Sequence, residues 1–508
     1  MTITARPSIN RIPTFVSDER VDMKAGLLFD ALSKYVTSLE GPSKAKYLAW
    51  ASKHGGKVSV EYSDPGIGRF DIRVKGLKDG ETMYTQAFPG DHGNLFKSSI
   101  CPKYYRDCDI SNCHPVLLSQ LCVAEGIATP VLDRYIQQRA DVIGECGLPK
   151  SQFKRLFFST VLYDFACSER QLMHKCAEAG VSQLPELLLE LREEVRTAAN
   201  TLIDRYPEYM QGAIERKGAT YRNLDGTALA LIVQTQEKLC LHALYQFWRS
   251  KGITVGALIH DGLHVACEDS TKGHLREASE YIHGLTGYRV TLEYKTWEPP
   301  PELAKAAVCS DTVSAAEFAH SLLEGRLLNC DDRVFFCSED KLWVSGDRVV
   351  SKQVTVAVST MHIFKATNSG SLTTMSREAN TMKQIADQVI RTAPEDSTFL
   401  ARMFEQTMYL LPYTNGHYDF RRKQFVPELI ECMSRVPIDF PARIQADIDE
   451  VQQRILGPIF NDDAELQYTF LTNLARALAA IVSDKVWRRR RLRTSGPSCQ
   501  DRSCRRPS

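Results

Sequence analysis

Two aspartates lie where extended chain gives way to another structure, which is where a rigid fold can hold a metal-binding carboxylate. Asp109 is near the end of the extended segment Tyr104–Ile110, ahead of a helix that Pro115 can begin. Asp261 lies at the tip of a predicted hairpin, Ile253–Cys267. Mg²⁺ prefers oxygen ligands, and phosphoryl transfer can use two such ions about 3.5–4 Å apart. The pair therefore predicts metal-assisted phosphoryl transfer, provided the fold joins residues 152 positions apart (261 − 109).

Both aspartates also have simpler interpretations. The Asp-Gly pair between two apolar, β-branched runs is a strong turn signal, so the hairpin alone can explain Asp261. Asp107 and Asp109 alternate along a strand and share one face, while Asn112 or His114 is suited to cap the following helix. A His-Asp pair is also typical of phosphohydrolases of the HD type. That class carries the pair on helices, whereas here it lies between strand-like runs.

Cations between the two aspartates could hold phosphate groups. The segment Leu148–Phe165 has the pattern of an amphipathic helix, and Lys150 and Lys154 are four residues apart on one face of it. The alternative is that both lysines are ordinary solvent-exposed helix cations.

Taken together, these motifs resemble those of a polymerase family. An aspartate at a strand end leading into a helix, and I-H-D-G at residues 259–262, resemble motifs A and C of family A DNA polymerases. The longer pattern D-x-D-I-x-N-x-H-P-x-x-L at residues 107–118 is similar to the transposon–virus polymerase family, a relative of family A DNA polymerases and of single-subunit phage RNA polymerases. Other positions that fit its pattern are Arg69, Tyr135, Arg139, Gln236 and Glu237.

The resemblance implies an α+β fold for residues 22–295, with a palm (a small antiparallel sheet with helices) and helical fingers within Pro115–Trp248. It implies that the Asp109 and Asp261 carboxylates and the Ile110 carbonyl hold two Mg²⁺ ions, with Mn²⁺ able to substitute. The residues implied to bind the nucleotide are Lys150, Lys154, Arg155, Tyr163 and His114. Those implied to contact primer or template are His260, Arg139, Arg69 and Gln236.

The spacing of the fingers helix departs from the family pattern. The family places a lysine eight residues before an aromatic residue. Here Arg155 is eight residues before Tyr163, and Lys154 is nine before it. Either Arg155 takes the role of the lysine, or the helix contains an irregular turn. His114 stands where family A DNA polymerases keep a glutamate that crowds the 2′ position of the sugar, which favours deoxynucleotides.

The second half begins after a proline-rich break, which predicts a linker over residues 296–312. Residues 313–487 are expected to form a second, mostly helical α+β domain, with a small strand region at Arg333–Val358 and short strands around Asn415-Gly416. This part resembles the region preceding the ATPase core of superfamily 3 helicases of viruses and mobile elements. The loop G-x-x-x-x-G-K-[ST] occurs nowhere in the sequence, which predicts no ATPase or helicase activity.

Composition says less about function than the motifs do. The 508 residues carry a formal net charge of +1, so a nucleic-acid partner would need a local basic groove. The 15 cysteines include no C-x-x-C pair, and the gaps among Cys101, Cys108, Cys113 and Cys122 do not match the usual zinc spacings. Reduced thiols, no signal sequence and no membrane-length apolar run predict an intracellular protein, nuclear or cytoplasmic, without a membrane partner.

The composition of both ends of the chain predicts irregular segments. Residues 1–21 are predicted to be a flexible N-terminus, and residues 488–508 a basic, disordered tail. The tail reflects either truncation or an altered reading frame, or it is a genuine segment that contacts nucleic acid or directs nuclear import. The leading hypothesis is a polymerase that uses DNA primer–template and deoxynucleoside triphosphates in the replication of a virus or transposable element, with a replicative helicase as a partner. RNA stays open as a product or template. The alternatives are a catalytically inactive nucleic-acid-binding remnant and a primase-like initiator.

Overall fold

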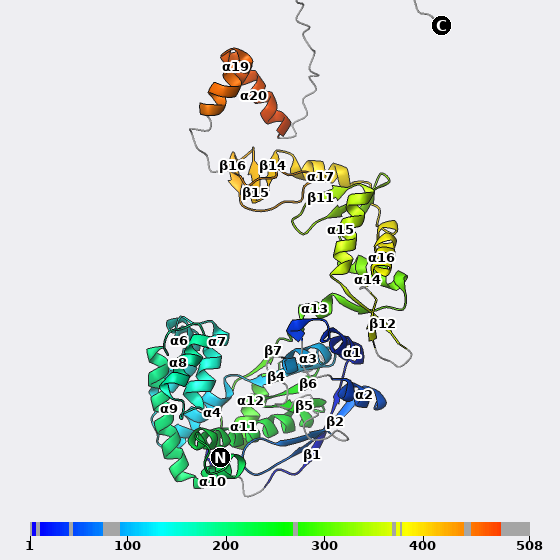
Figure 1. The fold of residues 1–508 in the computed structure, drawn as a ribbon. Helices are drawn as coiled ribbons and strands as arrows, with labels where there is room; N and C mark the ends of the chain where they lie inside the picture. The colour runs from blue at the N-terminus through cyan, green and yellow to red at the C-terminus, as the bar shows by residue number, and fades with distance from the viewer. Residues whose placement is uncertain are drawn as a thin grey trace, which may run out of the picture. The chain divides into compact units, whose positions relative to one another are not determined.

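The computed structural model describes residues 3–6, 11–39, 44–74, 92–267, 273–367, 372–375, 378–440 and 449–478 (Figure 1). The chain divides into two compact units. The first comprises residues 1–308 and 362–374, and the second residues 309–361 and 375–508. Both mix helices with small, mainly antiparallel sheets. Among the helices described, none has the length and apolar character needed to span a bilayer. The basic tail at residues 488–508 lies outside the described residues.

An N-terminal sheet in the first unit has the order β1-β2-β3, with antiparallel neighbours. Its strands are β1 (Phe15–Arg20), β2 (Lys57–Ser63) and β3 (Asp71–Val74). Phe15–Arg20 belong to the segment expected to be flexible, yet they form a strand because Ser17 and Glu19 alternate into the interior. The Ser17 hydroxyl donates a 2.6 Å hydrogen bond to the carbonyl of Val255, which fastens this sheet to the next one.

The central sheet of the first unit has the order β5-β6-β4-β7, and each pair of neighbours is antiparallel. Its strands are β4 (Tyr105–Ile110), β5 (Val255–Ile259), β6 (Gly262–Ala266) and β7 (Leu292–Lys295). β4 is therefore flanked by two strands that follow it much later in the sequence, β6 after 152 residues (262 − 110) and β7 after 182 (292 − 110). This arrangement brings the segment expected to carry Asp109 beside the hairpin expected to carry Asp261.

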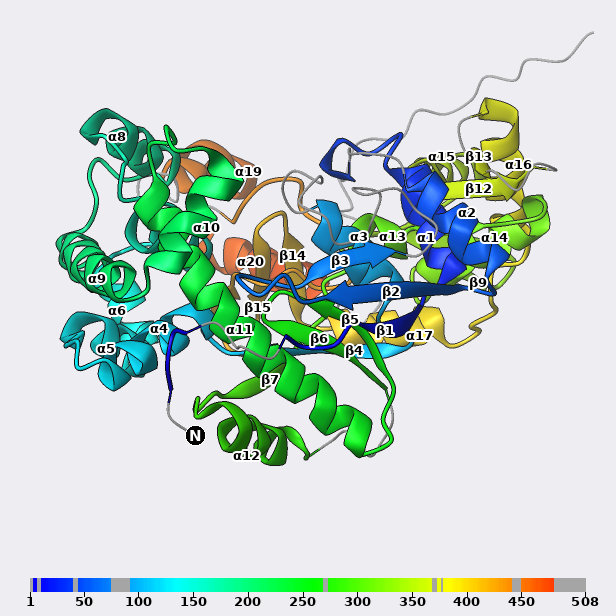
Figure 2. The ribbon, with the colours of Figure 1, turned by 90° about the horizontal axis from the view of Figure 1, so that it is seen from below.

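The first unit also contains many helices. Figure 2 shows α4 to α10 gathered at one end of the unit, with the long helix α11 running from them along the sheets. α11 is buried along most of its length because it carries small and apolar residues of its own on nearly every face. The helices are α1 (Met23–Leu32), α2 (Ala45–Lys53), α3 (His92–Ile100), α4 (Cys113–Ala124), α5 (Pro130–Gln137), α6 (Arg139–Glu145), α7 (Lys150–Leu156), the π-helix η2 (Phe157–Leu162), α8 (Glu169–Glu178), α9 (Glu186–Arg205), α10 (Pro207–Lys217), α11 (Leu224–Ser250), α12 (Leu275–Thr286) and α13 (Pro301–Ala304), with the short 3-10 helix η1 (Thr37–Leu39).

A third sheet completes the first unit, in the order β13-β12-β8. β8 (Ala306–Val308) pairs in parallel with β12 (His362–Ala366), and β12 pairs antiparallel with β13 (Leu372–Thr374). The chain leaves the first unit after β8 and returns to it with β12. The core of this unit extends into the third sheet, since Ala306 and Phe364 belong to its buried cluster.

The second unit has its own small core, in which Phe335, Trp343 and Phe399 pack together with ring centroids 4.7–5.0 Å apart. The prediction of strands within Arg333–Val358 is wrong for Asp347–Ser359, which form helix α15. The reason is that Val350, Val354 and Val358 recur every four residues and are all buried on one helix face. The hairpin around Asn415-Gly416 is present. The elements are α14 (Thr312–Leu322), β9 (Leu327–Cys330), β10 (Arg333–Cys337), β11 (Trp343–Ser345), α15, α16 (Ala379–Arg391), α17 (Phe399–Thr407), β14 (Leu410–Tyr413), β15 (Gly416–Asp419), β16 (Gln424–Val426), the π-helix η4 (Gln452–Leu456), α19 (Gly457–Phe460) and α20 (Ala464–Leu478).

Candidate active site

The two aspartates meet at one end of the central sheet. Asp109 lies opposite Gly262 in the pairing of β4 with β6, and the backbone N–H of Ile110 donates a 3.0 Å hydrogen bond to the carbonyl oxygen of Asp261. Both side chains line one cavity of about 450 Å³, and Ile110 lines it too. A shared metal site requires the fold to bring Asp109 and Asp261 together, and the pairing of β4 with β6 does so.

The hairpin turn differs from the one expected. Ile259 pairs with Gly262, so the two turn residues are His260 and Asp261, and the positive φ of 52° falls on His260. Gly262 is the first residue of β6 and serves a different purpose. A Cβ atom on it would lie 2.5 Å from Asp109 Oδ1 and 2.6 Å from the carbonyl oxygen of Cys108. The glycine is needed because the Asp109 carboxylate occupies that space.

Electrostatics at Asp109 favour a bound cation. Burial and the negative charge of Asp261 raise the pKa of Asp109 to about 7, against the opposing effect of Lys295. Two carboxylates held this close repel each other when both are ionised, and a divalent ion between them removes that repulsion. The donor set is made of oxygen atoms, which Mg²⁺ prefers. The residues present therefore fit such an ion.

β7 adds two charged residues that the sequence gave no reason to single out. Glu293 lies opposite Asp109 in the pairing of β7 with β4, and both Glu293 and Lys295 line the cavity. The Lys295 ammonium forms an ion pair with the Asp109 carboxylate. The only local signal was the alternation of apolar and charged residues in Leu292–Lys295, which is typical of a strand but does not reveal its partner.

The cavity is also lined by three basic residues, called the basic wall here. Arg139, Lys150 and Lys154 line the same cavity. Arg155 does not; its guanidinium pairs with Glu178 at 2.9 Å on an exposed surface. Between Lys154 and the aromatic residue Tyr163 the chain forms the π-helix η2, whose wider turn absorbs one extra residue. Of the two interpretations of the nine-residue spacing, the geometry therefore favours the irregular turn.

A chain of hydrogen bonds joins three residues that line the cavity to the buried Glu237. The Tyr163 hydroxyl is hydrogen-bonded to His114 Nδ1 at 2.5 Å, and His114 Nε2 lies 3.0 Å from Glu237 Oε2. Arg69 Nε donates to the same oxygen at 2.8 Å, and its Nη2 donates to Glu237 Oε1 at 3.1 Å. Burial alone would raise the pKa of Glu237, but the His114 ring and the Arg69 guanidinium outweigh it and lower that pKa to about 2. Glu237 is thus a buried anion that holds the His114 ring and the Arg69 guanidinium in place.

Neighbours of Glu237 on α11 hold the loop that carries Arg69. The hydroxyl of Thr235 accepts a 2.8 Å hydrogen bond from the backbone N–H of Gly68. The Lys238 ammonium pairs with the Asp64 carboxylate and donates a 2.9 Å hydrogen bond to the carbonyl of Gly66. Lys238 and Asp64 are both buried. The helix therefore anchors this loop at three points, which sets the position of Arg69.

The remaining predicted residues divide between the cavity and its surroundings. His260 lines the cavity, and burial together with the Arg69 guanidinium lowers its pKa. Tyr135 is not a lining residue, but its hydroxyl donates a 3.2 Å hydrogen bond to Asn112, which lines the cavity. Gln236 lines a separate cavity of about 330 Å³ beside Thr4, and the α11 residue that reaches the site is Gln234. Residues 75–91, which follow the strand after Arg69, lie outside the described part of the chain.

Comparison with known proteins gives one relationship of moderate extent. No family model matches the sequence. Over 402 residues, which is 75% of this chain, the sequence is 24% identical to "Putative helicase V13" of Sputnik virophage. The match covers 49% of that protein, so the chain spans about half the length of this curated relative. The chain is thus distantly similar to a viral protein that is named as a helicase.

Proposed function

We propose that the first unit is a template-dependent nucleotidyltransferase that extends a DNA primer with deoxynucleoside triphosphates, in the replication of a virus or transposable element. The observation that carries the proposal is the placement of Asp109 and Asp261 at one end of an antiparallel sheet, lining a cavity that Lys150 and Lys154 also line. In this proposal the sheet β5-β6-β4-β7 is a polymerase palm, and the helices from α4 to α11 form the fingers.

The acidic end of the cavity would hold the metal ions through the carboxylates of Asp109 and Asp261 and the carbonyl of Ile110. Two Mg²⁺ ions bound there would lower the pKa of the primer 3′-hydroxyl and neutralise charge on the departing pyrophosphate. In the transfer, the 3′-oxygen bonds to the α-phosphorus, the bond from that phosphorus to the pyrophosphate oxygen breaks, and the hydroxyl proton passes to water. Because Asp109 sits in a buried position with a pKa near 7, metal and protons compete for it.

The basic wall would bind the triphosphate. Lys150, Lys154 and Arg139 line the same cavity as the two carboxylates, so they can neutralise the phosphates of a nucleotide bound there. Lys295 reaches Asp109 from β7 and keeps the carboxylate partly neutralised. Fixed cations of this kind position a phosphoryl group and stabilise the charge that develops on it.

The sugar and base would meet His114 and Tyr163. Both residues line the cavity, and their mutual hydrogen bond together with Glu237 leaves the imidazole little freedom to turn away. A ring held rigidly in that position leaves no space for a 2′-hydroxyl, which favours deoxynucleotides. His260, beside Asp261, would face the primer terminus.

The similarity to the virophage protein supports a role in viral replication, since that protein is named as a helicase. In our proposal the polymerase site works with a replicative helicase as its partner, and the second unit is the part of this chain that contacts it. Primer–template DNA and deoxynucleoside triphosphates are the proposed substrates.

Magnesium-dependent primer extension by the full chain tests the proposal. We expect Asp109→Asn and Asp261→Asn each to reduce extension at least about 100-fold while primer–template binding is kept. Asp107→Asn is the matched control, because Asp107 shares a face of β4 with Asp109 but pairs with Lys97 at 3.2 Å and does not line the cavity. Wild-type protein that binds DNA but extends nothing would identify an inactive remnant. Synthesis without a primer would identify a primase-like initiator.

A further inference from the structure

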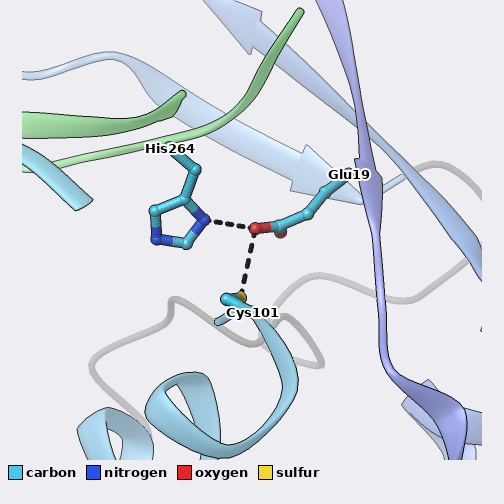
Figure 3. Close-up of side chains that lie close together, drawn as sticks. All are labelled: Glu19, Cys101 and His264. Atoms are coloured by element: carbon cyan, nitrogen blue, oxygen red, sulfur yellow. Dashed lines mark hydrogen bonds and ion pairs between the residues drawn. The ribbon is translucent and has the colours of Figure 1, made fainter. Parts of the chain in front are cut away.

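A second cluster of metal-ligand side chains lies inside the first unit, away from the cavity. Glu19 of β1, Cys101 at the end of α3 and His264 of β6 point toward one another (Figure 3). His264 Nδ1 lies 2.5 Å from Glu19 Oε1, and Cys101 Sγ lies 3.6 Å from the same oxygen. Each of the three residues has a relative exposure of 0%. Segments distant in the sequence thus bring a nitrogen, a sulfur and an oxygen ligand together in the interior.

Hydrogen bonds alone leave this cluster incomplete. A proton shared between His264 and Glu19 accounts for one carboxylate oxygen, but the other, Glu19 Oε2, has no hydrogen-bond partner among the described residues. The Tyr47 hydroxyl, also buried, has none in the described part of the chain either, and it lies within the electrostatic influence of Glu19 and Cys101. A carboxylate oxygen buried without a partner costs free energy, and a bound cation would supply the missing partner.

The distances suit a tetrahedral zinc ion. With Zn–S about 2.3 Å and Zn–O about 2.1 Å, tetrahedral geometry separates the sulfur and oxygen by about 3.6 Å. The Cys101 Sγ to Glu19 Oε1 distance is 3.6 Å. The nitrogen and oxygen must move apart by about 0.9 Å to reach the separation of about 3.4 Å that two zinc bonds require. That movement is within the reach of a small rotation of the glutamate side chain.

We propose that Glu19, Cys101 and His264 bind a structural Zn²⁺ ion, with the second oxygen of Glu19 or the hydroxyl of Tyr47 beside the fourth position. Carboxylate, thiolate and neutral imidazole carry a total charge of −2, which the ion neutralises, so the filled site places no net charge in the interior. Binding releases the proton of the thiol and the proton shared by His264 and Glu19 to solvent. The donor set distinguishes this site from the cavity, since a thiolate selects zinc and carboxylate oxygens select magnesium.

The position of the site gives it a bracing role. It joins β1 of the N-terminal sheet, the segment that leads into β4, and β6, which follows the hairpin. His264 lies opposite Asp107 in the pairing of β6 with β4, two residues along the strand from Asp109. An ion enclosed without solvent access cannot take a substrate, so its effect is to hold the two sheets together. This inference does not depend on the proposed function.

Zinc content of the full chain is the direct test. We expect wild-type protein exposed to zinc and then desalted to keep about one equivalent per chain, measured by mass spectrometry of the metal. Cys101→Ser and Glu19→Gln should keep less than about one fifth of that amount. Cys122→Ser is the control, because Cys122 is equally buried but lies on α4 outside the cluster, and it should keep the full equivalent. Wild-type protein without zinc, or Cys101→Ser with as much zinc as the wild type, would overturn the proposal.

Cobalt substitution keeps the test decisive if Cys101→Ser fails to fold. Co²⁺ bound by wild-type protein should give a thiolate-to-cobalt charge-transfer band in the near ultraviolet and the strong visible bands of a tetrahedral ion. Cys122→Ser should give the same spectrum. Weak, octahedral-type visible bands with no charge-transfer band in the wild type would exclude Cys101 as a ligand and refute the site, whatever the behaviour of the variant.

Discussion

Gly262 lies directly opposite Asp109 in the pairing of β4 with β6, and a Cβ atom there would come within 2.5 Å of the Asp109 Oδ1 atom. The added Cβ atom would also lie 2.6 Å from the carbonyl oxygen of Cys108. Neither neighbour can yield easily, since one is backbone and the other is the proposed metal ligand. The smallest residue of the hairpin therefore controls where the Asp109 carboxylate points.

Gly262→Ala should reduce primer extension at least about tenfold, because the added methyl group displaces the Asp109 carboxylate, and overpacking should lower the free energy of unfolding by about 1–3 kcal/mol. Gly284→Ala is the control: it lies on α12, and nothing lies within 4 Å of its added Cβ. That variant should keep full activity and gain slightly in stability from its higher helix propensity. Steady-state extension rates and urea denaturation of both variants measure these effects, and equal activity in the two would contradict the close approach.

Lys154 and Arg155 are adjacent but should behave differently. Lys154→Ala should raise KM for the deoxynucleotide by about tenfold, because it removes one of the cations that face the triphosphate. Arg155→Ala should change KM by less than about twofold, since its exposed ion pair with Glu178 contributes little. Steady-state kinetics over a range of nucleotide concentrations measures both, and a larger effect from Arg155 would mean that the π-helix does not orient Lys154 as described.

His114 should limit the use of ribonucleotides. His114→Ala opens space beside the sugar, so the preference for deoxynucleotides over ribonucleotides should fall by about tenfold or more. Tyr163→Phe keeps the aromatic ring but loses the hydrogen bond of 2.5 Å to His114 Nδ1, so it should have a smaller effect in the same direction. Competition between the two nucleotide types in single-nucleotide extension measures the ratio. An unchanged ratio in both variants would refute a role for His114 in selecting the sugar.

Glu237 should make the protein sensitive to acid. Its pKa is about 2 in the folded protein, below the ordinary value of 4.5, so it stabilises the folded state above about pH 4.5 and that stability is lost as the pH falls towards 2. The free energy of unfolding of the wild type should fall over this range by up to about 3 kcal/mol more than that of Glu237→Gln, which has no carboxyl group to titrate. Urea denaturation at several pH values measures the two slopes. Parallel slopes would show that Glu237 is not held as a buried anion.

Much of the candidate site follows from local signals in the sequence. The β-branched runs around the Asp-Gly pair predict the hairpin, and the extended segment before Pro115 predicts β4. Both signals depend on a few neighbouring residues, which is why they survive without knowledge of the fold. That the two acidic segments adjoin came from the family resemblance and not from pattern alone, because strand pairing at long range leaves no local trace.

Long-range partners account for what the sequence did not reveal. Lys295 reaches Asp109 only because β7 pairs with the outer edge of β4, and Glu237 holds Arg69 only because α11 passes beneath that loop. Arg155 and Gln236 lie outside the cavity because helix phase, including one π turn, decides which side chains face it. Asp347–Ser359 form a helix and not the expected strand, because the four-residue spacing of the buried valines outweighs the preference of valine for strands.

The position of β4 between two strands that are synthesised much later has a consequence for the folding of the first unit. Tyr105–Ile110 leave the ribosome long before Leu292–Lys295, so β4 has neither of its neighbours while the intervening helices are synthesised. Closing so long a loop is slow compared with forming a helix, and the acidic pair can exist only once it is closed. The proposed metal site of a nascent chain therefore cannot form until most of the first unit has emerged.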